Sequence, residues 1–179
     1  EKILQSAYSD LIAFGKLFSP QDFLASSTPA FHHEVCRLLL DKRIQQLALV
    51  LPRDHAKSTL AATAVLHRIL FATKDSPEFI CWIGESELNT KTPESRQQIK
   101  DWVTAAVFPA IDFDKGGFLW CNGTVVHYDS FLNGVVQSSR EAKNNMEEFS
   151  WDVLTYKAIL DNGQPLWPSR WPIEKLEAR

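Results

Sequence analysis

The sequence is poor in the features that mark disulfide-rich, zinc-binding and membrane proteins. Its three cysteines, Cys36, Cys81 and Cys121, are far apart and form neither a metal-ligand spacing nor a disulfide framework. We therefore expect buried free thiols in a reducing compartment. No apolar run approaches the roughly 18 residues that span a bilayer, and the opening residues EKILQSAYSD do not resemble a secretory signal. The sequence predicts a soluble intracellular protein.

An excess of positive charge is also absent. Nineteen Lys and Arg residues against 22 Asp and Glu residues give a formal net charge of -3. Such a balance provides no general attraction to nucleic acid, so any contact with DNA requires a local patch. The 45% hydrophobic and 23% charged residues are typical of a globular protein, and 179 residues suffice for one domain with a real core.

The most informative stretch runs from Gln46 to Phe71. The apolar run 47–51 predicts a buried strand. After Lys57, a helical periodicity predicts a helix whose apolar residues are Leu60, Ala64, Leu66, Ile69 and Leu70. Strand, polar loop, Lys-Ser and helix in this order are typical of a phosphate-binding loop. Backbone N–H groups and the positive helix end attract the anion, the lysine contacts the outer phosphates, and the hydroxyl holds Mg²⁺. The candidate nucleotide-binding residues, called the predicted phosphate loop below, are Pro52, Arg53, Asp54, His55, Ala56, Lys57, Ser58 (also the Mg²⁺ ligand) and Thr59.

Both glycines of the standard pattern G-x-x-x-x-G-K-[ST] are missing from this loop. Leu51 and Ala56 stand in their places. If Ala56 has a positive φ, its Cβ costs on the order of 1 kcal/mol, and nucleotide affinity is modest. The alternative interpretation is an ordinary helix N-terminus with a hydroxyl near its cap.

Apolar patterns predict alternating helices and strands along the chain. Helices are expected over 1–18, 31–41, from Lys57 to Leu70 and from Thr92 to Pro109, and strands over 47–51, 79–83, 118–121 and 153–160. This alternation predicts an α/β fold with a mostly parallel sheet that binds ligands at the carboxyl ends of its strands. We expect residues 1–45 to be a helical segment that packs on the core, and residues 46–179 to form that core. Packing is preferred over a contribution of residues 1–45 to an adenine pocket.

Four segments occur in a fixed order along the chain. They are the loop Pro52–Ser58, the stretch Glu94–Trp102, the stretch Asn122–Ser130 and the stretch Gly163–Pro168. In the same order they resemble the phosphate loop, the helix after the Walker B strand, the coupling motif and the "dG-x-x-LWP" segment of one family. That family comprises the ATPase domains of tailed-bacteriophage terminase large subunits, which package DNA into procapsids. The resemblance spans roughly residues 30–179 and implies a P-loop NTPase fold of the RecA-like (ASCE) class.

The resemblance implies a Mg²⁺-dependent ATPase and assigns residue roles. Lys57 would neutralise the β- and γ-phosphates, Ser58 would bind Mg²⁺, and Arg53 would stabilise the γ-phosphate in the transition state. The alternative for Arg53 is an ion pair with Asp54. The coupling residues, which would report the γ-phosphate state to the DNA-gripping part, are Gly123, Thr124 and His127.

The Walker B strand that this family requires has no room in the sequence. Only Ile83-Gly84-Glu85-Ser86-Glu87-Leu88 precedes the matching helix. Either a stretch is absent near Ser86, or the protein lacks this acidic strand. A separate omission near 137–149 is a further alternative, because that polar segment fits the family poorly. Glu87, and after it Glu85, are the candidate catalytic glutamates; otherwise both are solvated surface carboxylates.

The resemblance also implies the partners. These are double-stranded DNA, a portal protein and a small terminase subunit, with a homo-oligomeric ring on the portal and a monomeric isolated domain. The location implied is the cytoplasm of an infected bacterial host, with no place in the mature virion and no membrane contact. The nuclease domain of the family should follow Arg179, so no DNA cleavage is expected of this chain. Alternatives are another P-loop translocase or helicase-like ATPase, a kinase, or a nucleotide-binding domain without hydrolysis.

Other candidate sites are weaker. Asp112 and Asp114 alternate like metal ligands, but Phe113-Asp114-Lys115-Gly116 is more typical of a turn. His32 and His33 are neighbours on a predicted helix and cannot share a face, so we do not take them as ligands. The six tryptophans are expected to serve packing.

Overall fold

The computed structural model describes residues 2–73, 92–125 and 127–178. The chain forms two compact units. Among the described residues, the first unit comprises 2–41, 54–73 and 157–178, and the second comprises 42–53, 92–125 and 127–156. The boundary therefore falls between Arg53 and Asp54, inside the predicted phosphate loop. No helix among the described residues is long and apolar enough to cross a membrane.

Helices make up most of the regular structure of the first unit. They are α1 (Lys2–Ser9), α2 (Leu11–Phe18), α3 (Pro20–Phe23), α4 (Ala30–Leu40), α5 (Lys57–Phe71) and α9 (Ile173–Glu177). The single helix predicted over 1–18 is interrupted at Asp10, whose carboxylate accepts hydrogen bonds from the N–H groups of Ile12 and Ala13. This N-cap starts α2 as a separate helix.

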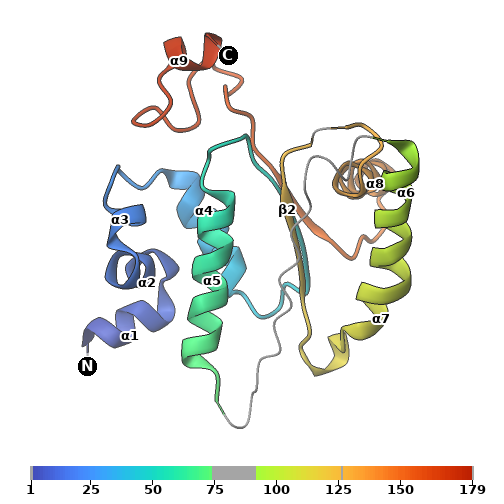
Figure 1. Cartoon of the computed structure of the whole chain (residues 1–179), viewed down its shortest axis with the longest axis horizontal. Helices are drawn as coiled ribbons and strands as arrows, with labels where there is room; N and C mark the ends of the chain where they lie inside the picture. The colour runs from blue at the N-terminus through green and yellow to red at the C-terminus, as the bar shows by residue number, and fades with distance from the viewer. Residues whose placement is uncertain (1, 74–91, 126, 179) are drawn as a thin grey trace. The chain divides into compact units, whose positions relative to one another are not determined.

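The core of the first unit forms where α2, α4 and α5 pack against one another (Figure 1). Its buried apolar side chains include Leu11, Ile12, Phe14, Val35, Leu39, Leu60 and Ala64. A Cβ at Gly15 would lie 2.5 Å from the ring of Phe23. Glycine at this position therefore permits the close contact between α2 and the end of α3.

The buried face of α5 differs from the predicted one. Leu60 and Ala64 are buried as expected, but Leu66, Ile69 and Leu70 are exposed, and Thr63 and His67 are buried instead. Both polar side chains have partners, since Thr63 donates to the Thr59 carbonyl and His67 Nε2 lies 2.9 Å from the Tyr8 carbonyl oxygen. Burial of hydrogen-bonded polar groups is tolerated, so an apolar pattern alone did not identify the packed face.

The second unit contains a three-stranded parallel sheet with the order β2-β1-β3. Its strands are β1 (Gln46–Val50), β2 (Leu119–Gly123) and β3 (Asp152–Thr155). In the register, Ala48 of the central strand lies opposite Cys121 on one side and Val153 on the other. The predicted α/β fold is confirmed at this level, as a parallel sheet flanked by helices and preceded by N-terminal helices. The strand predicted at 79–83 lies outside the described residues.

Several helical segments accompany the sheet in the described part of this unit. They are α6 (Pro93–Trp102), a π-helical turn (Val103–Val107), α7 (Phe108–Ala110) and α8 (Phe131–Asn145). Pro109 was expected to end the helix that begins after Thr92, but the helical backbone continues to Ala110. The π turn ends at Val107, two residues before Pro109, and this widening of the helix accommodates a residue that lacks an N–H group and crowds the preceding turn.

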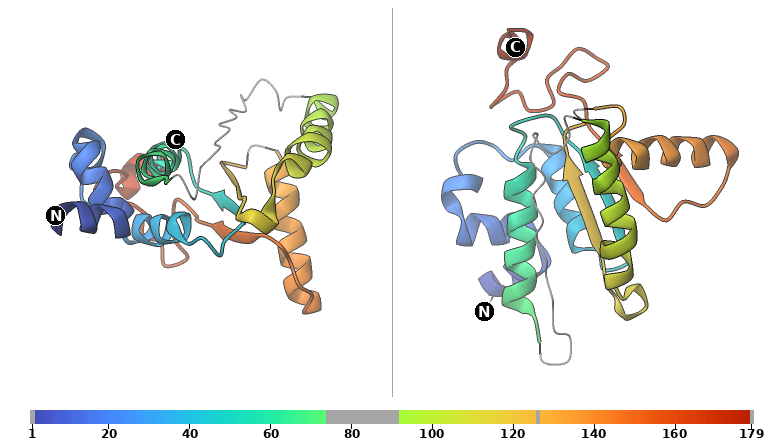
Figure 2. Two further views of the ribbon diagram at one scale, coloured as in Figure 1. Left: turned by 90° about the horizontal axis from the view of Figure 1, so that it is seen from below. Right: turned by 45° about the vertical axis from the view of Figure 1, so that its right-hand side comes forward.

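Helix α8 packs on the sheet and lies beside α6 (Figure 2). The buried cluster comprises Ala48, Val50, Leu132, Val135, Val136 and Trp151. The segment 137–145, where a second omission was considered, continues α8 without a break. Asp112 caps a 3-10 turn (Phe113–Lys115) and pairs with Lys115, so the turn interpretation of this aspartate pair is confirmed.

Candidate functional site

The backbone just before α5 has a left-handed conformation. Ala56 has φ 62° and ψ 19° and is the N-cap residue of α5, whose first residue is Lys57. The sequence places Ala56 where the standard pattern has glycine, and the backbone adopts the conformation that glycine would favour. A left-handed alanine costs on the order of 1 kcal/mol. Asp54 also has φ 62°, so the two positive angles turn the loop sharply as it enters the helix.

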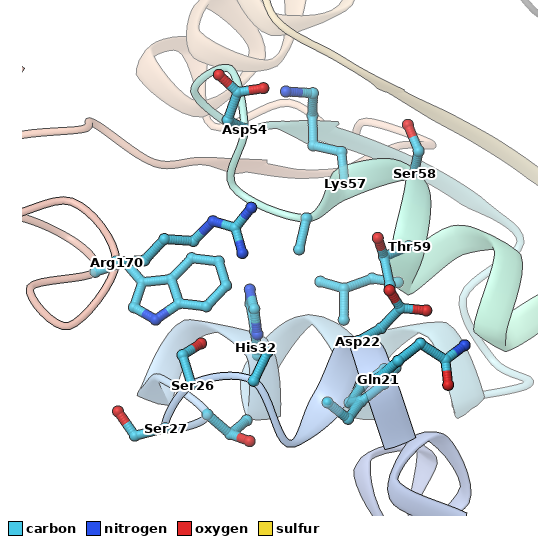
Figure 3. A pocket seen from close by; sticks show the side chains of 16 residues that line it. Gln21, Asp22, Ser26, Ser27, His32, Asp54, Lys57, Ser58, Thr59 and Arg170 are labelled. Carbon is cyan, nitrogen blue, oxygen red and sulfur yellow. The ribbon is translucent and has the colours of Figure 1, made fainter. Parts of the chain in front are cut away.

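A cavity of about 330 Å³ lies beside this loop, entirely within the first unit. Three separate parts of the chain line it: the stretch from Gln21 to His32, the loop and helix start from Asp54 to Leu60, and the pair Trp167 and Arg170. Figure 3 shows the side chain of Arg170 extending toward His32, while Lys57 points toward Asp54. The volume is at the lower end of the range of about 300–1,000 Å³ found for ligand pockets.

Part of the N-terminal segment 1–45 forms one wall of this cavity. Gln21, Asp22 and the residues up to Thr28 line the cavity with Lys57, Ser58 and Thr59. Most of these side chains carry hydroxyl, amide or charged groups, so this wall offers hydrogen bonds to a polar ligand. Whether 45/46 is a domain boundary stays a prediction.

An aromatic cluster holds the loop in place. Its members are Phe31, His32, His55, Trp167 and Trp171. The buried ring of His55 stacks on Trp171 at 6.2 Å, and Trp171 Nε1 donates a hydrogen bond of 3.2 Å to the Asp54 carbonyl. The ring of His32 meets Trp167 edge-on at 4.6 Å. The C-terminal segment thus fixes both the loop and the wall of the cavity opposite it.

His32 lies at the centre of this cluster as a neutral imidazole. It is 5% exposed, and burial lowers its pKa to about 4, against a smaller opposing contribution from a hydrogen bond with the His55 backbone. The charge of Arg170 also lowers the pKa of His32. Its Nε2 atom has no hydrogen-bond partner among the described residues. We had discounted His32 as a ligand because it cannot share a face with His33, but it alone of the two is buried and lines the cavity.

The second unit carries the start of the predicted phosphate loop and the predicted coupling residues. Leu51 follows β1 and donates its N–H to the Gly123 carbonyl at 3.0 Å. The Thr124 hydroxyl donates to the Leu51 carbonyl at 2.8 Å. The end of β2 is therefore hydrogen-bonded to the residue from which the loop departs. Leu51 stands where the standard pattern has its first glycine, and its side chain is fully buried in the core.

The loop after β2 is held by charged groups. Asp129 pairs with Lys100 and with the buried Arg96, both on α6. These hydrogen bonds hold the pKa of the Asp129 carboxyl below its ordinary value of 3.8. The Asp129 N–H also donates to His127 Nδ1 at 3.1 Å. The predicted coupling residue His127 therefore helps to fold this loop, which leads into the Ser130 cap of α8.

The remaining predicted site residues lie either in the second unit or outside the described residues. Arg53 is exposed and Pro52 is half-buried, both in the second unit. The candidate glutamates Glu85 and Glu87 lie outside the described residues, as does Ser86. In the described ranges, no group of three or more His, Cys, Asp or Glu side chains is placed to hold a metal ion. Cys36 is a buried free thiol, as expected, and burial raises its pKa to about 12. Cys121 was also expected to be buried, but it is only half-buried.

Comparisons of the chain with protein-family models, curated proteins and solved structures find no match.

Sequence reasoning missed His32, Trp167 and Arg170 as site residues. A signal for His32 did exist, since His32, Cys36 and Leu39 follow the i, i+4, i+7 spacing of one helix face, and all three are buried. No comparable sequence pattern predicts a role for Arg170. It lines the cavity because the C-terminal segment packs near α4, far away along the sequence.

Proposed function

We propose that the chain binds ATP with Mg²⁺ at the predicted phosphate loop and hydrolyses it, as the motor domain of a viral DNA-packaging terminase. The observation that carries the nucleotide site is Ala56, whose left-handed backbone directly precedes Lys57 and Ser58 at the start of a long helix beside a cavity. Strained backbone of this kind persists only where the surrounding structure determines it, and it gathers at ligand sites. Backbone N–H groups in such a loop form a concavity that favours an anion.

The roles follow from the chemistry of each side chain. Lys57 supplies a positive charge for the outer phosphates, and Ser58 supplies a hydroxyl ligand for Mg²⁺. When bound, Mg²⁺ would neutralise charge that develops on the phosphate oxygens. Arg53 would stabilise the same charge, and Glu87 or Glu85 would orient the attacking water; both assignments rest on the resemblance alone.

Two lines support a motor over a simple nucleotide-binding site. Four segments resemble the terminase ATPase family in its own order along the chain. In addition, the Thr124 hydroxyl is bonded to Leu51, where the loop begins. A hydroxyl at that point is suited to transmit a change in the loop to the segment that follows β2. Double-stranded DNA, a portal protein and a small terminase subunit are the partners that this proposal implies.

The decisive experiment is Mg²⁺-dependent ATP hydrolysis by protein expressed from its natural coding sequence. Wild type should hydrolyse ATP, and Lys57→Ala should lower kcat by about 100-fold or more, because it removes a charge that stabilises the transition state. Lys175→Ala, which removes one exposed charge from α9, is the matched control and should keep wild-type activity. Added double-stranded DNA should raise the rate of a packaging motor or translocase and leave that of a kinase unchanged.

A second candidate is a nucleotide-binding domain without hydrolysis. The alanine at position 56 and the buried Leu51, in place of two glycines, favour it. Wild type that binds ATP without turnover would establish this candidate and remove the enzyme assignment. An absence of binding would remove both.

A further inference from the structure

Two buried nitrogen atoms in the wall of the cavity lack hydrogen-bond partners. Among the described residues, neither Trp167 Nε1 nor His32 Nε2 has one, and each of these residues is only 5% exposed. Both residues line the cavity. Buried polar atoms nearly always have partners in folded proteins, so exceptions beside a cavity point to a ligand that supplies them.

A cation lies beside these two groups. The guanidinium carbon of Arg170 is 5.3 Å from the centroid of the Trp167 ring, within the range of a cation–π contact. No hydrogen bond or ion pair of the Arg170 side chain occurs in the described parts of the chain. The Trp167 ring holds the planar guanidinium on the cavity wall. The N–H groups of the guanidinium can then donate hydrogen bonds to acceptor oxygens of a ligand.

We propose that Arg170 and Trp167 bind the nucleotide directly and form, with neutral His32, a second set of contacts in the cavity that Lys57 lines. This inference rests on the proposed nucleotide site and adds residues that the phosphate-loop pattern does not contain. An arginine fork and an indole N–H only donate, so they select the acceptor-rich phosphate or ribose part of the ligand. His32 contributes one donor or acceptor without a charge, since its pKa is far below neutrality.

The C-terminal segment is thereby a binding element as well as a packing element. Trp171 fixes the Asp54 carbonyl and Ser169 bonds to Ser27, so the backbone around Arg170 is anchored on two sides of the cavity. Such anchoring positions the guanidinium before the ligand arrives, which reduces the entropy lost on binding.

The test measures the dissociation constants of ADP and of MgATP by calorimetry for wild type and four variants. Arg170→Ala should raise Kd by roughly 10-fold or more, the effect of losing a charge-assisted hydrogen bond. Trp167→Phe keeps an aromatic ring but removes the N–H, and should raise Kd about threefold to tenfold. Arg170→Lys should fall between wild type and Arg170→Ala, and Lys175→Ala should bind as wild type does.

A direct readout comes from the indole ¹⁵N–¹H resonance of Trp167, assigned by its loss in Trp167→Phe. The resonance should shift when ADP binds to wild type, because the N–H gains an acceptor. Wild-type affinity in Arg170→Ala, with ADP binding that still depends on Lys57, would overturn this inference and leave the proposed function intact. No binding of nucleotide to wild type would overturn both. Should Arg170→Ala misfold by circular dichroism, the indole shift in wild type decides alone: a shift supports the inference, and an unmoved resonance overturns it.

Discussion

Each unit holds its own predicted site residues, and the two units do so by different forces. In the first unit, aromatic packing of His55 on Trp171 and of His32 on Trp167 holds the loop and the cavity wall. In the second unit, the loop after β2 is fixed by the ionic contacts of Asp129 with Arg96 and Lys100.

This difference predicts different sensitivities. Aromatic packing depends little on salt, whereas ionic contacts at a half-exposed carboxylate weaken when salt screens them. High salt should therefore loosen the loop after β2 in the second unit more than the cavity wall of the first unit. Acid should act on both units, but in different pH ranges, since His32 and Asp129 take up their protons at different pH values.

The largest expected effect is on the aromatic cluster. Trp167→Ala should lower the free energy of unfolding by about 3–5 kcal/mol, because it removes a large buried side chain and leaves a cavity. Urea denaturation measures this change. Trp102→Ala, at a more exposed tryptophan of the second unit, is the matched control and should cost less than about 1 kcal/mol. Equal losses at the two positions would contradict a cluster that holds the first unit together.

The next effect is a pH dependence that arises from His32. Burial lowers its pKa in the folded protein from 6.5 to about 4. Between pH 6.5 and pH 4 the unfolded chain binds a proton at His32 more readily than the folded protein does. The free energy of unfolding is therefore highest above pH 6.5 and falls as the pH drops toward 4, by up to roughly 3 kcal/mol. Urea denaturation across this pH range, with His32→Phe and the matched His33→Phe, isolates the contribution. An unchanged pH dependence in His32→Phe would refute the assignment.

Asp129→Asn should weaken the second unit less than Trp167→Ala weakens the first. The folded pKa of Asp129 is below 3.8, so the ionic contribution is complete above about pH 4 and is lost as the pH falls through the folded value. Thermal unfolding of wild type and Asp129→Asn should differ at pH 7 and converge in strong acid and in about 1 M salt. A difference that survives both conditions would show that Asp129 acts through neutral hydrogen bonds.

The smallest effect concerns the backbone at Ala56. Ala56→Gly should stabilise the protein by about 0.5–1 kcal/mol, since relief of the left-handed strain exceeds the added freedom of the unfolded chain. Nucleotide affinity should rise by a few fold if the relaxed loop fits phosphates better. Urea denaturation measures the change. A loss of stability in Ala56→Gly would mean that packing of the alanine methyl group contributes more free energy than the left-handed backbone costs.

Short-range patterns predicted what lies close together in the sequence. The strand before Pro52, the helix after Ala56 and the parallel sheet follow from apolar runs, periodicity and alternation. A positive φ at Ala56 was considered only as a condition, because the standard pattern has glycine at that position, and the backbone there is left-handed.

Long-range contacts explain what the sequence could not predict. Trp171 reaches Asp54 across 117 positions, and no local pattern encodes that approach. The burial of His67 depends on a carbonyl of Tyr8, 59 positions away, so the choice between two faces of α5 was made by tertiary contacts. The roles of Glu85 and Glu87 fall outside the described residues and stay predictions.

The anchoring of Asp54 by Trp171 also sets an order of events during synthesis. Those 117 positions take on the order of ten seconds to translate at about 5–20 residues per second. Throughout that interval the nascent chain lacks the tryptophans against which the rings of Phe31 and His55 pack. A ribosome that stalls before residue 157 therefore carries a chain in which the loop at Asp54 has been synthesised but Trp171 has not. In that state the aromatic side chains beside the loop are available to a chaperone.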